Sequence, residues 1–485
     1  MGIERFCEFI GKSGRKIEHY SKFIPVALSL KNLIVFVSSV GETAPASKSF
    51  EFLKYELPVR FANIMQEFRL LPSVLRESRA VQQICSLYEE TFDTLMKYEE
   101  CSPRAPSVVS EFTDDVDNIL QKHSRIVEIL AVGVKEIQNS RSWCEDQELQ
   151  LQYFLDRFYV SRIGIRTLLN QHLLLYGPTL CNKQSHVGNI DPACSPVQIA
   201  INAYSYSRLL CMQVYGRAPG CDIEIHDCVD KGFTIGGFNE IDFRVDATGH
   251  PSTKSYLLEN QPNCTDVSVK GQDVTFCYIP GHLFYILYEL LKNSMRAVVE
   301  NYSFDAHLPR LKILICNAPE DIIIKITDFG GGMTLNIVER TFRYNFTTAL
   351  HAKNLHSTVF DLEDRYSEIR PVRQVTSNDR MTYEVQSDRS TCSPIAGRGH
   401  GLPLSRLYAK YLGGNLTLYS VERVGTSALI YLKRRSEDAH ELLPIFNHTS
   451  KSVYENGSPG RDWISGSRLY MQSNKTLLES SVAAS

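Results

Sequence analysis

The sequence predicts an α+β protein, with an N-terminal four-helix bundle followed by a two-layer α/β sandwich. Four long segments with apolar residues at helical spacing occupy residues 1–185, and from about residue 195 helical segments alternate with β-rich runs. A chain of 485 residues also exceeds the usual size of a single hydrophobic core, so at least two domains are expected.

The first domain, residues 1–185, is expected to be the helical bundle. Its four amphipathic segments have proline or glycine near their ends, which is typical of helix boundaries. They are residues 57–72, 80–100, 108–140 and 150–177. The stretch "CNKQSHVGNIDPACSP" then predicts the linker out of the bundle.

The second domain, residues 190–440, is expected to be the sandwich. A helix is predicted over residues 197–216, and two β-rich runs around a short turn in residues 311–333 are typical of a hairpin. Later, "GLPLSRLYAKYLGG" predicts a helix that glycine ends, and "NLTLYS" and "TSALIYLKRR" predict strands. Helices that alternate with antiparallel strands indicate a two-layer arrangement.

Two polar tracts interrupt this pattern. Residues 216–272 are expected to form an insertion, and residues 350–394 a long loop, because both tracts are rich in polar and turn-forming residues. Residues 441–485 remain as a C-terminal tail.

Composition and charge exclude several classes of protein. The hydrophobic content of 43 % is ordinary for a globular protein, and the net charge of −3 gives no overall attraction to nucleic acid or an anionic membrane. Apolar runs such as "ILAVGV" are too short to span a bilayer. The thirteen cysteines include no C-x-x-C pair, so reduced thiols are expected rather than a zinc ribbon.

The stretch "HLFYILYELLKNSMRAVVE", residues 282–300, predicts a helix with an apolar stripe. Glu289, Asn293 and Arg296 lie within about 60° of one another on a different face, roughly 130° from the centre of that stripe. A solvated face is the ordinary explanation of such a row. The motifs that follow in the chain favour a functional explanation.

Two glycine-rich motifs follow that helix. In "TDFGGGM", Asp328 ends a strand, and Gly330 and Gly332 allow the backbone to approach a ligand, although a simple turn is the alternative. In "GRGHGLPLSRLYAKYLGG", three alternating glycines precede a helix, the arrangement in which backbone N–H groups receive a phosphate.

Two other nucleotide-binding classes do not match. The eukaryotic serine/threonine kinases that share "DFG" place their glycine-rich loop first and an H-R-D motif before it, and this chain has no H-R-D. No G-K-[ST] follows a glycine run, which excludes a P-loop.

The order of a polar helix, D-x-G-G-G, a long loop and G-x-G-x-G-L resembles the GHKL ATP-binding fold of gyrase B, sensor histidine kinases and MutL proteins. The chain is similar to the mitochondrial pyruvate dehydrogenase kinase family over most of its length outside the two polar tracts. The resemblance rests on "ELPVRFANIMQEF", "YFLDRFYVSRIGIRTLLNQHLLLYG", "ELLKNSMRA", "GLPLSRLYAKYLGG" and "VGTSALIYLK". The segment "FTTA" looks more like the related branched-chain 2-oxoacid dehydrogenase kinase, whereas "NQHLLLYG" looks more like the pyruvate enzyme.

The resemblance implies an ATP-dependent protein serine kinase of the mitochondrial matrix that uses Mg²⁺ and inactivates the E1 alpha subunit of the pyruvate dehydrogenase complex. It implies that Glu289 is the general base and that Asn293 is a magnesium ligand. Asp328 would bind the adenine amino group, with Gly330 and Gly332 admitting the ring. Arg296 would contact phosphate or pair with a carboxylate.

The remaining ATP-binding residues implied by the family lie around its ATP lid, expected at about residues 347–396. They are Thr347 and Thr348 at the start of the lid, and Gly397, Arg398, Gly399, His400, Gly401 and Leu402 in the phosphate loop. Tyr285 stands where many members have a histidine that tunes the base, and Arg398 and His400 replace aromatic residues.

The resemblance also implies partners for the bundle and the tail. The bundle would bind the lipoyl domain of the E2 acyltransferase core and hold an inhibitory anion near His123, Arg162 and Arg166. Asp462 and Trp463 resemble a pair that reaches the partner subunit of a homodimer. A branched-chain kinase and a non-catalytic ATP-binding scaffold, the latter suggested by Tyr285 and the altered glycine loop, stay open as alternatives.

Overall fold

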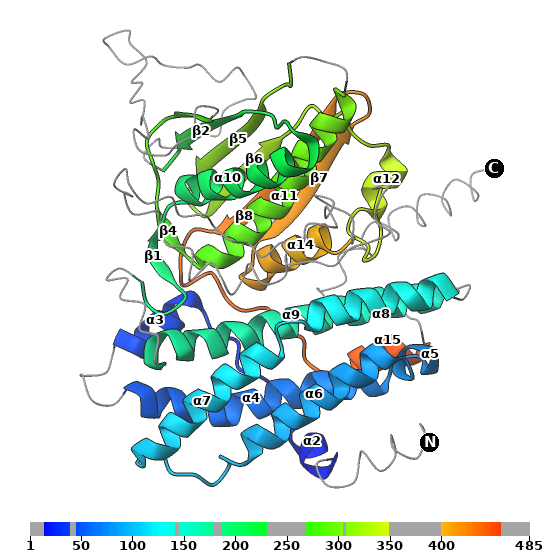
Figure 1. Ribbon diagram of the computed structural model, residues 1–485. Helices are drawn as coiled ribbons and strands as arrows, with labels where there is room; N and C mark the ends of the chain where they lie inside the picture. Colours follow the sequence, from blue (N-terminus) through cyan, green and yellow to red (C-terminus); the bar gives the residue numbers. More distant parts are fainter. Residues whose placement is uncertain are drawn as a thin grey trace, which may run out of the picture.

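The computed structural model describes residues 14–38, 45–140, 145–177, 186–229, 267–303, 307–348 and 399–456. It confirms the α+β class, because a helical domain precedes a domain built on a mixed sheet (Figure 1). Among the described helices, none combines the length and the apolar character needed to cross a membrane.

The helical domain is built from eight described helices around one apolar core. They are α2 (Gly14–Tyr20), α3 (Leu30–Ser38), α4 (Pro45–Arg69), α5 (Ser73–Arg76), α6 (Arg79–Met96), α7 (Pro106–Lys122), α8 (Ile126–Ser140) and α9 (Glu145–Tyr176). Helix α4 contacts α6, α7 and α9, and buried aromatic residues such as Phe61, Phe68 and Phe158 fill the space between them.

Two predicted helix boundaries in this domain are wrong. The segment 108–140 forms two helices that separate at residues 123–125, so that α7 packs on α9 while α8 packs on α6. Helix α4 begins at Pro45 rather than at residue 57, and Pro58 lies inside it. An internal proline removes one backbone hydrogen bond, and the burial of Leu53, Leu57 and Phe61 on both sides of Pro58 offsets that loss.

The second domain contains a six-stranded sheet in the order β3-β2-β5-β6-β8-β7. Its strands are β2 (Cys221–Asp227), β3 (Val267–Lys270), β5 (Leu311–Asn317), β6 (Asp321–Thr327), β7 (Asn415–Val421) and β8 (Gly425–Lys433). The predicted hairpin is the antiparallel pair β5 and β6, and β8 joins β6 and β7 in the antiparallel sense. The prediction of antiparallel strands therefore holds for these four.

The other two strands correct the predicted insertion at 216–272. Strand β2 pairs in parallel with both β3 and β5, so both ends of that tract belong to the sheet. The predicted bounds are too wide because residues 221–227 and 267–270 form strands; residues 230–266 lie outside the described ranges.

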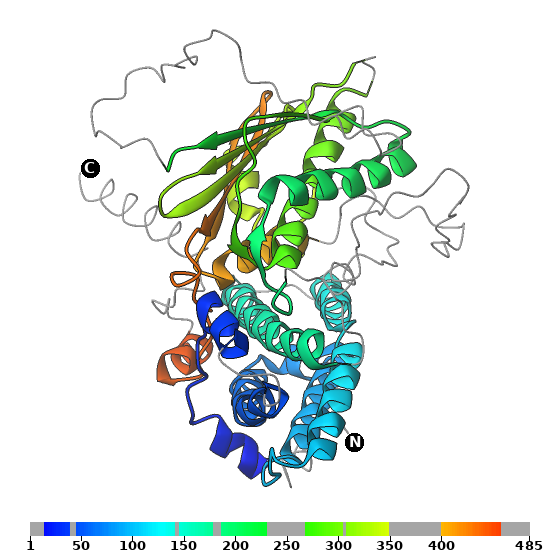
Figure 2. The ribbon, with the colours of Figure 1, turned by 90° about the vertical axis from the view of Figure 1, so that its left-hand side faces the viewer.

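Helices α10 (Pro196–Tyr215), α11 (Pro280–Asn301) and α14 (Gly401–Tyr411) lie on the same side of the sheet, as Figure 2 shows, which confirms the two-layer sandwich. Helix α10 begins with Pro196 after Ser195, whose hydroxyl accepts a hydrogen bond from the Gln198 amide, and it ends at Gly216 with φ 72°. The short strands β1 (Asp191–Cys194) and β4 (Phe276–Tyr278) pair beside it. Helix α12 (Leu335–Arg340) follows the glycine-rich turn.

The chain returns from the sheet to the helical domain after β8, and α15 (His448–Asn456) packs there (Figure 1). Glu441 accepts hydrogen bonds from Arg60, with Nη1–Oε1 and Nη2–Oε2 distances of 3.0 and 2.8 Å, and from the hydroxyl of Tyr411. Tyr454 donates to Glu67, which also binds the buried Arg157. The described part of the predicted tail, residues 441–456, thus completes the helical domain.

Candidate functional site

Helix α11 carries the polar row that the sequence singled out. Ile279 precedes its first turn, Pro280 opens it, and the predicted apolar stripe is buried. The helix contacts α10, α14 and β6, and Glu289 of its polar row meets Gly401 at the start of α14.

The alternative of a solvated face is wrong for Glu289, because this residue is only 7 % exposed. Its Oε1 lies 2.5 Å from Nζ of Lys292, a residue that is 3 % exposed. The same Nζ lies 4.6 Å from the ring centroid of Tyr288. Burying an ion pair costs desolvation energy. The buried pair beside the two glycine-rich motifs is therefore a candidate for a functional role.

Lys292 is a residue that the sequence argument missed. Its position one turn after Glu289 was a usable signal, because residues three apart on a helix are neighbours. Lysine is rarely buried, so a composition-based argument assigns it to the surface.

The carboxylate of Glu289 lies against the first turn of α14. A Cβ built on Gly401 would stand 2.1 Å from Oε2 of Glu289, so only glycine leaves room for the carboxylate there. The N-terminus of a helix presents free N–H groups and a partial positive charge. Glu289, Lys292 and these backbone amides therefore form one charged corner.

Asp328 lies at the end of β6, beside the same helix. Its carboxylate is buried and accepts hydrogen bonds from the Ser294 hydroxyl (3.1 Å), the Gly330 amide (3.0 Å) and the Thr426 amide (3.3 Å). Burial raises the pKa of this carboxyl group, and the hydrogen bonds act against that rise. Ser294 is a second residue that the sequence argument missed.

The glycines of the D-x-G-G-G motif are required by packing. A Cβ on Gly330 would lie 2.5 Å from Cβ of Ala297 on α11, and a Cβ on Gly332 would lie 2.1 Å from the Val421 carbonyl oxygen. Gly332 also has φ 62°, a conformation that L side chains rarely adopt. These two glycines let the turn fit between α11 and β7.

The remaining residue of the polar row, Arg296, meets the chain where the predicted lid begins. Its Nη2 donates to the Thr348 hydroxyl at 3.2 Å, and its Nε lies 3.8 Å from Oε2 of Glu300. Thr347 is half-buried beside Thr348. A carboxylate pairing of Arg296, one of the two expected contacts, is therefore present.

The described part of the phosphate loop meets the same segment. Gly399 has φ 69°, and its carbonyl oxygen accepts from the Asn345 amide at 3.1 Å. Leu402 lies half-buried in the first turn of α14. Gly397 and Arg398, most of the predicted lid and the pair Asp462 and Trp463 lie outside the described residues.

The side chain of His400, predicted to lie in the ATP-binding loop, is surrounded by protein rather than facing an open site. It is buried, with its ring 5.3 Å from that of Tyr344 and 6.0 Å from that of Tyr159 on α9. Its side chain therefore packs between the two domains.

Tyr344 fixes the start of the lid to the helical domain. Its amide donates to Gln152 Oε1 and its hydroxyl to Asp156 Oδ1, both at 2.8 Å, and the neighbouring Asn345 donates to Gln138 at 2.9 Å. The segment before the predicted lid is thereby joined to α8 and α9 by direct contacts.

This corner fits an anionic substrate that carries a hard divalent cation. Within the described ranges, no group of three or more His, Cys, Asp or Glu side chains is arranged to hold a metal ion by itself. Mg²⁺ prefers few protein ligands together with phosphate oxygens and water, and the half-buried Asn293 carries an amide oxygen of the kind that suits that preference.

The three residues predicted for a regulatory anion come together inside the helical domain. His123, Arg162 and Arg166 are buried, the His123 ring stacks on Tyr88 at 5.2 Å, and its Nε2 lies 2.8 Å from the Thr91 hydroxyl. Burial, followed by the charges of both arginines, lowers the pKa of His123 to about 3. Two buried guanidinium groups beside a neutral imidazole make an electropositive interior.

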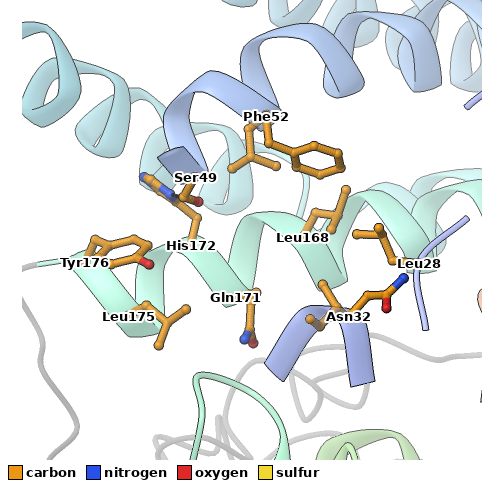
Figure 3. Close-up of a pocket in the computed structure, with 11 residues that line it drawn as sticks. Leu28, Asn32, Ser49, Phe52, Leu168, Gln171, His172, Leu175 and Tyr176 are labelled. Atoms are coloured by element: carbon orange, nitrogen blue, oxygen red, sulfur yellow. Dashed lines mark hydrogen bonds between the residues drawn. The ribbon is translucent and has the colours of Figure 1, made fainter. Parts of the chain in front are cut away.

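A separate apolar pocket of about 100 Å³ lies between α3, α4 and α9 (Figure 3). Leu28, Leu33, Phe52, Leu168 and Leu175 supply most of its wall, and Ser49 and His172 close one side through a 2.8 Å hydrogen bond. Burial lowers the pKa of His172 to about 4, so this side is uncharged at neutral pH. The pocket suits a thin apolar group.

Two family models match the chain. Residues 27–191 match the model described as "Mitochondrial branched-chain alpha-ketoacid dehydrogenase kinase", and residues 279–436 match "Histidine kinase-, DNA gyrase B-, and HSP90-like ATPase". The first covers most of the helical domain, and the second spans the described corner.

Similar curated proteins cover nearly the whole chain. A mitochondrial [pyruvate dehydrogenase (acetyl-transferring)] kinase of Ascaris suum is 35 % identical over 94 % of each chain. The Drosophila melanogaster kinase of the same name is 36 % identical over 95 % of this chain and 94 % of its own. The human kinase isozyme 4 is 34 % identical over 94 % of this chain and 92 % of its own.

Proposed function

The chain belongs to the mitochondrial pyruvate dehydrogenase kinase family, and we propose that it phosphorylates and inactivates the E1 alpha subunit of the pyruvate dehydrogenase complex. The transfer goes from ATP to a serine hydroxyl in the mitochondrial matrix. The observation that carries this proposal is the buried Glu289 and Lys292 pair at the N-terminus of α14.

The proposed mechanism assigns a step to each part of the corner. Glu289 Oε accepts the proton of the substrate serine as its oxygen attacks the γ-phosphorus. Lys292, 2.5 Å from that carboxylate, holds Glu289 in place and adds positive charge near the transferred group. The amides at the start of α14 receive the phosphates.

The remaining roles concern binding. Asn293 would hold Mg²⁺, which neutralises phosphate charge when it is bound. Asp328, kept in place by Ser294, Gly330 and Thr426, would accept a hydrogen bond from the adenine amino group. Arg296 and Thr348 would close the corner beside the phosphates. The fixed geometry supports transfer by positioning.

Two alternatives receive less support. The similar proteins that cover both domains are named as pyruvate dehydrogenase kinases, which does not favour the branched-chain substrate. A non-catalytic scaffold is not favoured either, because these similar proteins are named as kinases.

Incubation of the purified chain with Mg-ATP and both dehydrogenase complexes should label serine on the pyruvate dehydrogenase E1 alpha subunit. We expect this labelling because the similarity to the kinase family covers both domains. Phosphopeptide mass spectrometry and the loss of dehydrogenase activity measure the result. Preferential labelling of the branched-chain E1 would replace the proposed substrate with the alternative.

We also propose that the lipoyl domain of the E2 acyltransferase core docks at the apolar pocket between α3, α4 and α9. A lipoyl arm is long and thin, and the pocket wall is mainly leucine and phenylalanine (Figure 3). The proposal gives this apolar pocket an occupant of matching shape and polarity.

Leu175→Asp, which places a charge in that pocket wall, should weaken lipoyl-domain binding at least about tenfold, because a carboxylate excludes the apolar arm. Leu174→Asp is the matched control, since Leu174 is also half-buried on α9 but does not line the pocket. Calorimetry with the lipoylated and unlipoylated domain measures the effect. Equal losses in both variants would exclude this docking site.

The proposed homodimer depends on Asp462 and Trp463, because a large aromatic residue in a polar tail suits a pocket of another subunit. A chain that ends at residue 456 should therefore sediment as a monomer, while the full chain sediments as a dimer. An unchanged mass would show that the tail is not the dimer anchor.

The inner cluster of His123, Arg162 and Arg166 is proposed to bind an inhibitory pyruvate-like anion. Buried arginines bind carboxylates strongly because the low dielectric leaves the charge poorly screened.

A further inference from the structure

Two cysteines lie in contact at one end of the neighbouring parallel strands β2 and β5, away from the charged corner of Glu289 and Lys292. Cys316 is in β5, and Cys228 directly follows β2, where its amide donates to the Asn317 carbonyl oxygen at 2.9 Å. The two Sγ atoms are 3.6 Å apart. Side-chain rotation over a short distance would bring them to the bond length of about 2.05 Å.

The two thiols differ in surroundings. Cys228 is exposed, whereas Cys316 is half-buried. Burial, the hydrogen bond to Cys228 and the charge of Asp227 together raise the pKa of Cys316 to about 11. Cys316 therefore keeps its proton at neutral pH, and Cys228 is the sulfur that a peroxide in solution reaches first.

We propose that Cys228 and Cys316 form a reversible redox-active dithiol that a peroxide oxidises to a disulfide. This function is separate from phosphoryl transfer and does not depend on it. The eight cysteines of the described ranges are free thiols, so the pair is in its reduced form.

The reaction takes place in two steps. The Cys228 thiolate attacks one peroxide oxygen, the O–O bond breaks, and a Cys228 sulfenic acid forms while hydroxide leaves and takes up a proton as water. The Cys316 sulfur then attacks the Cys228 sulfur, and the hydroxyl group leaves with the Cys316 proton as a second water. Two thiols and one hydrogen peroxide thus give one disulfide and two waters, and a dithiol reductant reverses the change.

The cysteine pair lies at the opposite end of the sheet from Asp328, which is proposed to bind adenine. Cys316 faces Ile323 in the β5 and β6 pair, whereas Thr327, which precedes Asp328, faces Lys312 near the other end. A disulfide would join β2 to β5 at that far end of the sheet. Nucleotide binding is therefore expected to persist in the oxidised protein.

The test treats the full chain with a small excess of hydrogen peroxide and maps its cysteines by peptide mass spectrometry. The expected product is a peptide pair that joins Cys228 to Cys316, lighter by two hydrogen atoms and restored by dithiothreitol. Oxidation of both sulfurs to sulfinic acid without a cross-link would overturn the proposal.

Single variants test the order of the steps. Cys316→Ser should accumulate a sulfenic acid at Cys228 that dimedone traps, and Cys228→Ser should slow the oxidation of Cys316 at least about tenfold. Cys277→Ser is the matched control, because Cys277 is another half-buried thiol on a strand, and it should keep the disulfide. Equal oxidation of Cys316 with and without Cys228, or a cross-link to a different cysteine, would refute the pairing.

Discussion

Glu289→Gln should lower the rate of phosphoryl transfer by roughly 10²–10⁴ and leave the affinity for Mg-ATP nearly unchanged. Glutamine keeps the size of glutamate, so it fits against Gly401, but it cannot take a proton. It can still accept a hydrogen bond from Lys292 through its amide oxygen. Single-turnover transfer to the E1 alpha subunit, beside nucleotide affinity from calorimetry, measures the two effects separately.

Asn293→Ala is the comparison variant, because it removes a proposed metal ligand instead of the base. Binding of Mg-ATP itself should then weaken, and transfer should fall as a consequence. Transfer at the unmodified rate in Glu289→Gln would remove Glu289 from the role of base. Unchanged Mg-ATP affinity in Asn293→Ala would remove Asn293 from the metal site.

Arg166→Gln should weaken inhibition by pyruvate by roughly 10- to 100-fold, the usual worth of a charge-assisted hydrogen bond in a buried place. Arg166 is buried beside Arg162 and His123, so the substitution halves the arginine charge available to a carboxylate there. The inhibition constant, measured in the kinase assay at fixed ATP, gives the result.

Lys122→Gln is the matched control for that experiment. It also removes one positive charge that acts on His123, but Lys122 is exposed and pairs with Glu90. Surface pairs contribute little, so inhibition should change less than about threefold. Equal effects in the two variants would mean that the inner cluster is not the binding site.

The same cluster predicts how inhibition depends on pH. Because the pKa of His123 is lowered to about 3, its imidazole is neutral between pH 6 and 8, and the two arginines supply the charge. His123 is therefore expected to add no change in inhibition across that range. A strong gain in inhibition as the pH falls through about 6.5, the ordinary histidine value, would contradict this.

The periodicity of α11 was enough to predict its buried stripe and its polar row, since both follow from 3.6 residues per turn. The same helix geometry also predicts that Glu289 and Lys292 are neighbours, because they are three residues apart. It does not predict that the lysine is buried, because burial depends on the elements that pack over it. The neighbour of Glu289 on the other side, Gly401 of α14, lies more than a hundred residues later in the chain.

Other features were hidden for different reasons. In strand β2, every second residue, namely Cys221, Ile223 and Ile225, is buried in the core. This alternation is typical of a strand, but the polar residues between them made the segment look like a loop. The break between α7 and α8 contains neither glycine nor proline, so local sequence does not mark it. The contacts of Tyr344 with α9 join positions almost two hundred residues apart, and no periodicity reports such a pair.

The return of the chain from β8 to the helical domain has a consequence for the order of synthesis. Arg60 is made early, yet Glu441, one of the two carboxylates that neutralise it, is among the last described residues to leave the ribosome. Until then the buried guanidinium group has only Glu56 as its counter-charge. The helical domain thus begins to be translated before the sheet domain but is complete only after it, so its final assembly must wait for the synthesis of residues 441–456.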